Sequence, residues 1–314
     1  MTPRTNVMSK RRPQIQSGDV FQLPRGMLWL VILVGVLGLI VSGVGVLLVG
    51  GGDPLVTETL RGGTAELYGD GLYGFDTVFQ AANNRSTDLV TLLLGLPLLG
   101  LSLRWAWKGS LRGRLVLLGA LGYFTYVSAT YALGGVAYNE MFLAYVAFFS
   151  ASLFAFVLVF GSLLSIDLQP DRLPRRWPAV FMVVSGVATL AIWMIDPLAA
   201  LVEGGPPRGL DTYTTLFTYA FDIGVIVPAA IAAGVMIWRR HVVGYVTAAS
   251  LLVLEAFLMP IITIATIIQV QLGVSFEPGQ MIGPIAGFSL LAAFAIWVNV
   301  AVLRSVPKGA RNTG

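Results

Sequence analysis

Residues 85–114 read RSTDLVTLLLGLPLLGLSLRWAWKGSLRGR, a long apolar run with one acidic residue near its start and a cluster of basic residues at its end. Asp88 opens the run, and the cations from Arg104 to Arg114 close it. Basic residues favour the cytoplasmic side of a bilayer, so this asymmetry gives a membrane helix a direction. The stretch predicts a transmembrane helix that enters the bilayer at Asp88 and ends in a basic cytoplasmic hairpin.

The composition of the whole chain agrees with a membrane protein. Of its 314 residues, 56% are hydrophobic and only 11% are charged, and its mean hydropathy is +0.80. In soluble domains about a quarter of the residues are charged. The net charge of +4 comes from basic residues at the ends of apolar runs, which indicates membrane topology and not nucleic-acid binding. We therefore predict an all-α, multi-pass integral membrane protein with the lipid bilayer as its surroundings.

The residue types that most cofactor and metal sites need are scarce. The chain has no cysteine, which excludes disulfides, iron–sulfur clusters and thiolate catalysis. Its single histidine, His241, lies beside two arginines in a predicted hairpin and is expected to be a solvated loop residue, because metal sites usually need several His or Cys ligands. We predict no cofactor and no metal site.

Eight apolar runs are each close to the length that spans about 30 Å of hydrocarbon at about 1.5 Å per residue. They are residues 27–50, 88–103, 115–133, 141–164, 179–202, 214–238, 242–270 and 281–303. The first run is too long for a signal-peptide core and is predicted to be retained. The polar segment 51–87 is predicted to be an ordered outer loop or a short re-entrant piece, because it is rich in glycine and proline.

The distribution of basic residues predicts the orientation of the chain. With both termini in the cytoplasm, only Arg61, Arg85 and Arg208 of the 20 Lys and Arg residues lie outside. We therefore predict an inner (plasma) membrane protein with cytoplasmic N and C termini. The predicted parts are a basic tail 1–26, a first membrane half 27–164, a cytoplasmic linker 165–178, a second membrane half 179–303 and a tail 304–314.

Short motifs recur in the same order in the two halves. Asp53-Pro-Leu returns as Asp196-Pro-Leu, and Asp76-Thr returns as Asp211-Thr, each two residues after a glycine. In the same scheme Asp88 matches Asp222. Four spans per half predict a parallel 4+4 internal repeat with a pseudo-two-fold axis along the membrane normal. The alternative is that acidic residues recur simply because they favour helix N-termini.

Ionisable residues within apolar runs are the main candidates for a functional site. A charged side chain in the bilayer centre costs roughly 2.5 to 3.5 kcal/mol on insertion scales. Asp88, Asp222 and Glu255 are the acids concerned. In the functional interpretation, Asp88 and Asp222 line an outward-open cavity and bind a cation or exchange protons. In the structural alternative, Asp88 caps its helix or pairs with Arg85, and Asp222 bonds to nearby hydroxyl groups.

Tyr123, Tyr126 and Tyr131 fall near one helical face, and with Asn139 they would form a polar wall of the same cavity. Plain interhelical packing is the alternative for these tyrosines. The glycines of the first and third spans are expected to allow close helix packing. Four further acids, at predicted outer positions, are candidate contacts of the outer loop: Asp53, Asp76, Asp196 and Asp211.

Motifs for catalysis are mostly absent. The chain has no Gly-x-Ser-x-Gly elbow, and no histidine or lysine lies within an apolar run to activate a serine. An aspartyl dyad of Asp88 and Asp222 is chemically conceivable, but the Gly-x-Gly-Asp pattern is missing at Asp222. The sequence favours a protein that is not an enzyme.

One segment has a recognisable pattern. Asp88-Leu-Val-Thr, Gly95-Leu-Pro-Leu-Leu and Gly109-Ser-Leu-Arg-Gly, followed by Tyr131-Ala-Leu-Gly and Asn139, resemble a group of uncharacterised prokaryotic multi-pass membrane proteins. The resemblance covers about a quarter of the chain, from Asp88 to near Phe160. It implies a polytopic inner-membrane protein and implies no activity, so no functional residue is carried over.

These features together favour a small transporter, channel or ligand-binding membrane protein with an outward-facing cavity lined by acids and tyrosines. The alternative is a membrane sensor, assembly factor or complex subunit that uses the outer loop, and a third interpretation is an enzyme that acts on lipids. The expected partners are the bilayer and an unknown small ligand or ion. A homo-oligomer or a partner subunit is also expected, whereas nucleic acid is not.

Overall fold

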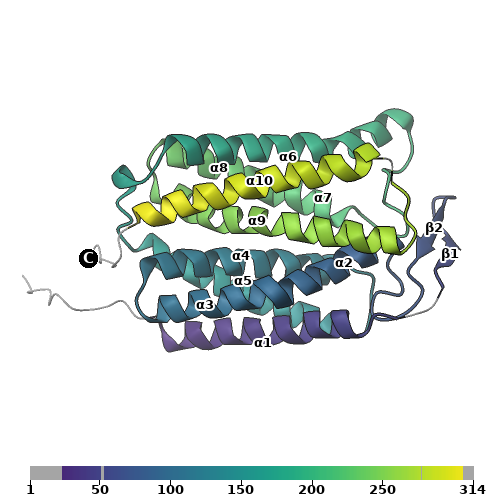
Figure 1. Ribbon diagram of the computed structural model, residues 1–314, viewed down its shortest axis with the longest axis horizontal. Coiled ribbons are helices and arrows are strands. Elements are labelled where there is room, and N and C mark those ends of the chain that lie inside the picture. The colour runs from purple at the N-terminus through teal and green to yellow at the C-terminus, as the bar shows by residue number, and fades with distance from the viewer. Residues whose placement is uncertain (1–22, 51–52, 277, 307–314) are drawn as a thin grey trace, which may run out of the picture.

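A computed structural model describes residues 23–50, 53–276 and 278–306 of the chain. Most of the two predicted cytoplasmic tails therefore lies outside the described residues. Within the described part, eight helical segments are long and apolar enough to cross a membrane, in agreement with the eight predicted spans. They lie side by side along the long axis, with α1 to α5 in one half of the bundle and α6 to α10 in the other (Figure 1).

The helices match the predicted spans closely, except at the second and sixth. The described elements are α1 (Arg25–Leu47), α2 (Val78–Val90), α3 (Leu96–Trp107), α4 (Leu111–Leu133), α5 (Phe142–Leu164), α6 (Arg176–Glu203), α7 (Phe217–Phe221), α8 (Val227–Trp238), α9 (Val242–Gln271) and α10 (Pro278–Ser305). A short 3₁₀ helix, η2 (Pro170–Arg172), lies between α5 and α6. Short turns join α3 to α4 and α8 to α9, whereas the connection from α1 to α2 is long and contains two strands.

The second and sixth spans are each interrupted by a π-helix. In the second span, η1 (Thr91–Gly95) joins α2 to α3, and in the sixth, η3 (Asp222–Ile226) joins α7 to α8. A proline follows each π-helix, at Pro97 and Pro228, where its missing N–H and its ring disturb the regular hydrogen-bond ladder. Single π-helical turns occur frequently at functional sites.

The predicted outer loop 51–87 is partly structured. It contains an antiparallel hairpin of β1 (Leu55–Glu58) and β2 (Thr64–Leu67), and α2 already begins at Val78. Thr77 is the N-cap of α2, because its side chain accepts a hydrogen bond from the backbone N–H of Gln80 at 3.2 Å. Asp88 therefore lies about three helical turns inside α2, so the expectation that it caps this helix is wrong.

Helix α4 occupies the centre of the bundle. It packs against α3 and α5 of its own half and against α9 of the other half. Close contact with α9 depends on glycine: a Cβ atom on Gly119 would meet Val253, and one on Gly122 would meet Ser250. This agrees with the expectation that these glycines serve close helix packing.

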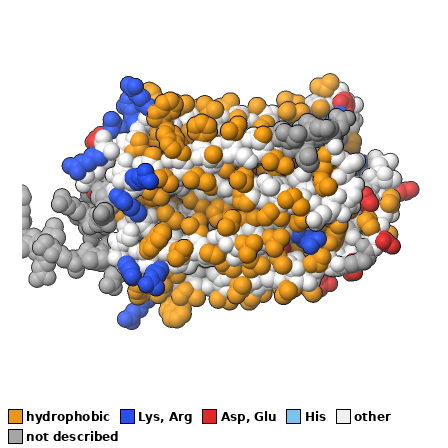
Figure 2. All heavy atoms as spheres, viewed as in Figure 1, with side chains coloured by type: hydrophobic (Ala, Val, Ile, Leu, Met, Phe, Trp, Pro, Cys, Tyr) orange, Lys and Arg blue, Asp and Glu red, His pale blue; other side chains and the backbone are white. Residues whose placement is uncertain are grey.

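Charged side chains are segregated along the bundle. In this view, the visible Lys and Arg side chains gather mainly at the end of the bundle where α10 ends, and the visible acidic side chains gather mainly at the end that carries the β-hairpin (Figure 2). Between the two ends, the surface in this view is covered mainly by hydrophobic side chains. Such a band, with polar ends, is the surface that a lipid bilayer requires.

Candidate functional site

Asp88 is fully buried in a cluster of hydroxyl groups from four parts of the first half. Its Oδ2 accepts a hydrogen bond from the Tyr73 hydroxyl at 2.6 Å, and its Oδ1 accepts one from the Tyr131 hydroxyl at 2.9 Å. Ser42 of α1 and Tyr145 of α5 lie beside this group. No ion pair joins Asp88 to Arg85 among the described residues, because Arg85 donates to the Tyr68 hydroxyl at 2.9 Å. The expected pairing of Asp88 with Arg85 is therefore wrong.

The hydroxyls of Ser42 and Tyr145 are buried and have no hydrogen-bond partner among the described residues. Gly45 of α1 packs directly on the carboxylate, so that a Cβ atom there would collide with Asp88 Oδ2. The Asp88 cluster is thus a closed polar site, built tightly around one carboxylate.

Asp222 lies in a different environment, at the first residue of η3. It is 7% exposed and faces Tyr126 of α4 and Trp193 of α6. The ring of Tyr126 also packs on Phe221, with centroids 5.5 Å apart. The interpretation of Asp222 as a residue that bonds to a nearby tyrosine agrees with these contacts.

Glu255 occupies a third environment, in α9 next to Ser185 of α6. Its Oε2 is buried and has no hydrogen-bond partner among the described residues. Asp88 therefore has neighbours in α1, α4 and α5, whereas Asp222 and Glu255 both face residues of α6. A cavity shared by the three acids stays a prediction.

The predicted tyrosine face of α4 is divided between these environments. Tyr131 reaches Asp88, and Tyr126 reaches Asp222. Tyr123 is fully buried, shares a hydrogen bond of 2.7 Å with Thr91, and packs on Phe257 with ring centroids 4.2 Å apart. Asn139 has a structural role, since its side chain accepts a hydrogen bond from the Met141 N–H at the start of α5 and donates one to the Leu72 carbonyl.

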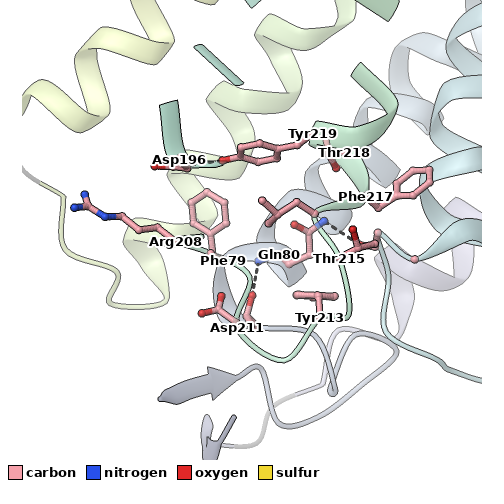
Figure 3. Close-up of a pocket in the computed structure, with 15 residues that line it drawn as sticks. Phe79, Gln80, Asp196, Arg208, Asp211, Tyr213, Thr215, Phe217, Thr218 and Tyr219 are labelled. Atoms are coloured by element: carbon pink, nitrogen blue, oxygen red, sulfur yellow. Dashed lines mark hydrogen bonds between the residues drawn. The ribbon is translucent and has the colours of Figure 1, made fainter. Parts of the chain in front are cut away.

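A cavity of about 310 Å³ lies near the hairpin end of the bundle. Asp196 of α6 and Asp211 of the α6–α7 loop, both predicted outer contacts, line it together with α7 residues and Gln80 of α2 (Figure 3). Asp88, Asp222, Glu255 and the three α4 tyrosines are not among its lining residues. Of the two other predicted outer acids, Asp53 is exposed outside the cavity.

Hydrogen bonds fix the polar wall of this cavity. The Tyr219 hydroxyl donates to Asp196 Oδ2 at 3.1 Å, and the Gln80 side-chain amide donates to the Gly135 carbonyl at 3.0 Å. Asp196 lies in the interior of α6, one residue before Pro197, within the predicted fifth span. Sequence reasoning missed Gln80, Thr215 and Tyr219 as lining residues, because only tertiary structure brings α2, α6 and α7 together.

Asp76 does not line the cavity but holds one of its lining residues, Tyr213. Its side chain is fully buried, and its Oδ1 accepts hydrogen bonds from the Tyr213 hydroxyl at 2.6 Å and from the Ala137 N–H at 2.8 Å. Tyr213 lines the cavity, so Asp76 ties the segment before α2 to the loops before α5 and α7. Its Oδ2 is buried without a partner among the described residues.

Burial raises the pKa of Asp76 from 3.8 to about 6, although the hydrogen bonds from Tyr213 and Ala137 oppose this shift. The folded protein therefore holds this proton to a higher pH than the unfolded chain does. Between about pH 4 and pH 6 the stability that this group contributes is lost as the pH rises.

We expect Asp76→Asn to be more stable than the parent at pH 7.5 by about 1–2 kcal/mol, because asparagine keeps an acceptor for Tyr213 and carries no buried charge. Thermal unfolding followed by tryptophan fluorescence, from pH 4 to pH 8, measures this. Between pH 4 and pH 6, the free energy of unfolding of the variant should also decrease less with rising pH than that of the parent. Asp53→Asn, at an exposed acid, serves as the control. A less stable Asp76→Asn protein with the parent's pH profile would contradict the expectation.

Comparison of the chain with models of known protein families, with curated proteins and with solved structures finds no match.

Proposed function

We propose that this protein is a membrane transporter or ligand-binding protein for a small polar solute, and that the cavity at Asp196 and Asp211 is where the solute enters. The buried carboxylate of Asp222, about one helical turn beyond the lining residue Tyr219, would compensate charge as the solute or a proton moves inward. Asp88, Asp222 and Glu255 do not line the cavity where we propose that the solute enters.

One observation carries the proposal. Thr218 and Tyr219 of α7 line the cavity, and Asp222 follows them about one helical turn further along the chain. At that residue the helix changes to the π-helix η3, which leaves part of the backbone without its regular hydrogen bonds. An open polar cavity thus adjoins a buried carboxylate at an irregular point of a membrane helix, a combination that favours function over packing.

The orientation that we propose places the cavity on the outer side of an inner (plasma) membrane. Its support is the gathering of basic side chains at the opposite end of the bundle, which the positive-inside tendency places in the cytoplasm. The resemblance of residues 88–160 to prokaryotic multi-pass membrane proteins stays a prediction that is compatible with this placement.

We further propose that the two halves form a parallel 4+4 repeat. Each residue of η1, α3 and the turn to α4 has a counterpart 131 positions later, in η3, α8 or the turn to α9. For example, η1 begins at residue 91 and η3 begins at residue 222. Ser110 and His241 cap α4 and α9 through their side chains at this shift. The close contacts of two glycines match in the same way: Gly113 lies against residues 105 and 106, and Gly244 lies against residues 236 and 237.

The α4–α9 contact supports the same proposal. With the shift of 131 positions, Gly119 corresponds to Ser250 and Gly122 corresponds to Val253. Gly119 contacts Val253 and Gly122 contacts Ser250, so each glycine contacts the counterpart of the other. A two-fold axis between α4 and α9 produces such reciprocity. In this register Asp222 corresponds to Thr91, and Asp88 corresponds to Tyr219. The two carboxylates are therefore not equivalent residues of the repeat, in contrast to the match that the sequence motifs suggested.

Proteoliposomes on a solid-supported membrane test the transport proposal. Charge movement is recorded after concentration jumps of choline, ethylammonium, glycine betaine, succinate and Na⁺. We expect a current for at least one solute class, and we expect Asp222→Asn to reduce it about tenfold or more. Asp53→Asn should leave it unchanged. Absence of current for every solute would overturn the transport proposal.

A second candidate function is favoured by the β-hairpin. Leu60 at its tip is 101% exposed and Val56 of β1 is 68% exposed, at the polar end of the bundle. Such apolar side chains outside the lipid band suit contact with another protein, as in a sensor, assembly factor or complex subunit. Two results together would favour this function: the parent protein gives no current in proteoliposomes, and it forms a larger native complex that Leu60→Glu abolishes.

A further inference from the structure

The cavity wall combines carboxylates with aromatic rings. Asp196 and Asp211 supply the acids, and Phe79, Phe217 and Tyr219 supply rings from α2 and α7 (Figure 3). Aromatic faces attract cations through the negative potential above the ring, and this attraction grows as the cation loses water. The rings and the carboxylates of this wall therefore both favour a positively charged ligand.

The carboxylates lack a basic partner. Asp211 accepts no hydrogen bond from the described residues, and burial raises the pKa of its carboxyl group. Asp196 is bonded only to the neutral hydroxyl of Tyr219 among the described side chains. Arg208 also lines the cavity, but its side chain is exposed, forms no ion pair in the described part of the chain, and extends away from the Phe217 side of the cavity (Figure 3). The negative charge of the wall is thus left for a ligand to neutralise.

The size and donor set of the cavity narrow the ligand class. A volume of about 310 Å³ lies at the lower end of the range for small-molecule pockets, so the ligand is small. Among the described residues, no group of three Asp, Glu or His side chains converges to hold a metal ion. Divalent cations prefer six or more oxygen ligands, whereas an ammonium group is satisfied by one or two carboxylates and aromatic faces.

We propose that this cavity binds a small organic cation, that is, a protonated amine or a quaternary ammonium group on a few carbon atoms. Asp211 and Asp196 face its charge, and Phe217 and Phe79 cover its apolar part. The proposal rests on the proposed function, of which it names the ligand class.

Equilibrium binding tests it independently of transport. The purified full chain in detergent is titrated with choline, ethylammonium, glycine betaine and succinate, and thermal stabilisation is measured. We expect stabilisation by choline or ethylammonium, with about tenfold weaker apparent affinity in Asp211→Asn and in Phe217→Ala. The matched controls are Asp53→Asn and Phe75→Ala, at an exposed acid and an exposed ring outside the cavity. Both controls should bind like the parent.

Arg208→Gln separates the ligand classes. For a cation we expect equal or tighter binding in this variant, because a nearby positive charge is removed. Stabilisation by glycine betaine or succinate that is lost in Arg208→Gln would overturn the cation proposal and leave the transport proposal standing. Failure of all four compounds to stabilise the protein would also overturn it. A current in proteoliposomes without binding of any cation would therefore overturn this inference and leave the proposed function standing.

Discussion

Asp88→Ala is expected to unfold at a markedly lower temperature than the parent protein, by about 5 °C or more. The substitution removes the acceptor of the Tyr73 hydroxyl and one acceptor of the Tyr131 hydroxyl, which keeps a bond of 3.1 Å to the Asn84 carbonyl. A buried donor without a partner costs about 1–3 kcal/mol, and the empty volume of the lost carboxylate adds to this. Thermal unfolding in detergent, followed by tryptophan fluorescence, measures the change.

Asp88→Asn is the matched variant, because it keeps the volume and one acceptor oxygen. We expect its unfolding temperature to fall between those of the parent and Asp88→Ala. An Asp88→Asn protein more stable than the parent would contradict a structural role. It would show instead that the carboxylate is kept at the expense of stability, as ionisable groups at functional sites within membranes are.

Which parts of this fold can be predicted from sequence depends on where the stabilising contacts lie. The apolar length of each span is a local property, so all eight membrane helices could be predicted. The first turns of α2 could not, because Gln80, Asn84 and Arg85 make residues 78–88 as polar as a loop. Distant groups stabilise those turns: Gln80 bonds to Gly135, Tyr131 bonds to Asn84, and Arg85 bonds to Tyr68.

The candidate site shows the same division. The acids at residues 88, 222 and 255 could be singled out because charge is costly in lipid, and they are indeed enclosed. The neighbours that enclose each acid could not be foreseen, since helical spacing fixes a face of one helix but not which neighbour covers it. The π-helices explain part of the difference: a π-turn of five residues rotates every later side chain relative to a regular helix.

Gly45→Ala is expected to destabilise the protein by about 3 kcal/mol, near the upper end for an added methyl group in a packed site. The new Cβ would collide with Asp88 Oδ2 and would lie 2.8 Å from the Tyr73 hydroxyl oxygen. Neither group moves freely, because each is bonded to the other at 2.6 Å. Relief therefore requires either breaking that hydrogen bond or moving α1 away from α2.

Gly43→Ala, two residues away on the same helix, is the matched control, because its Cβ would meet nothing within 4 Å. Alanine is a better helix former than glycine, so this variant should be as stable as the parent or slightly more stable. The comparison isolates the contact from helix propensity, which is the same for both substitutions. If both variants unfolded at the parent's temperature, α1 would not be packed on the Asp88 carboxylate. Destabilisation by Gly45→Ala that disappears in Gly45→Ala with Asp88→Ala would locate the clash at that carboxylate, since a lost contact partner makes the two effects non-additive.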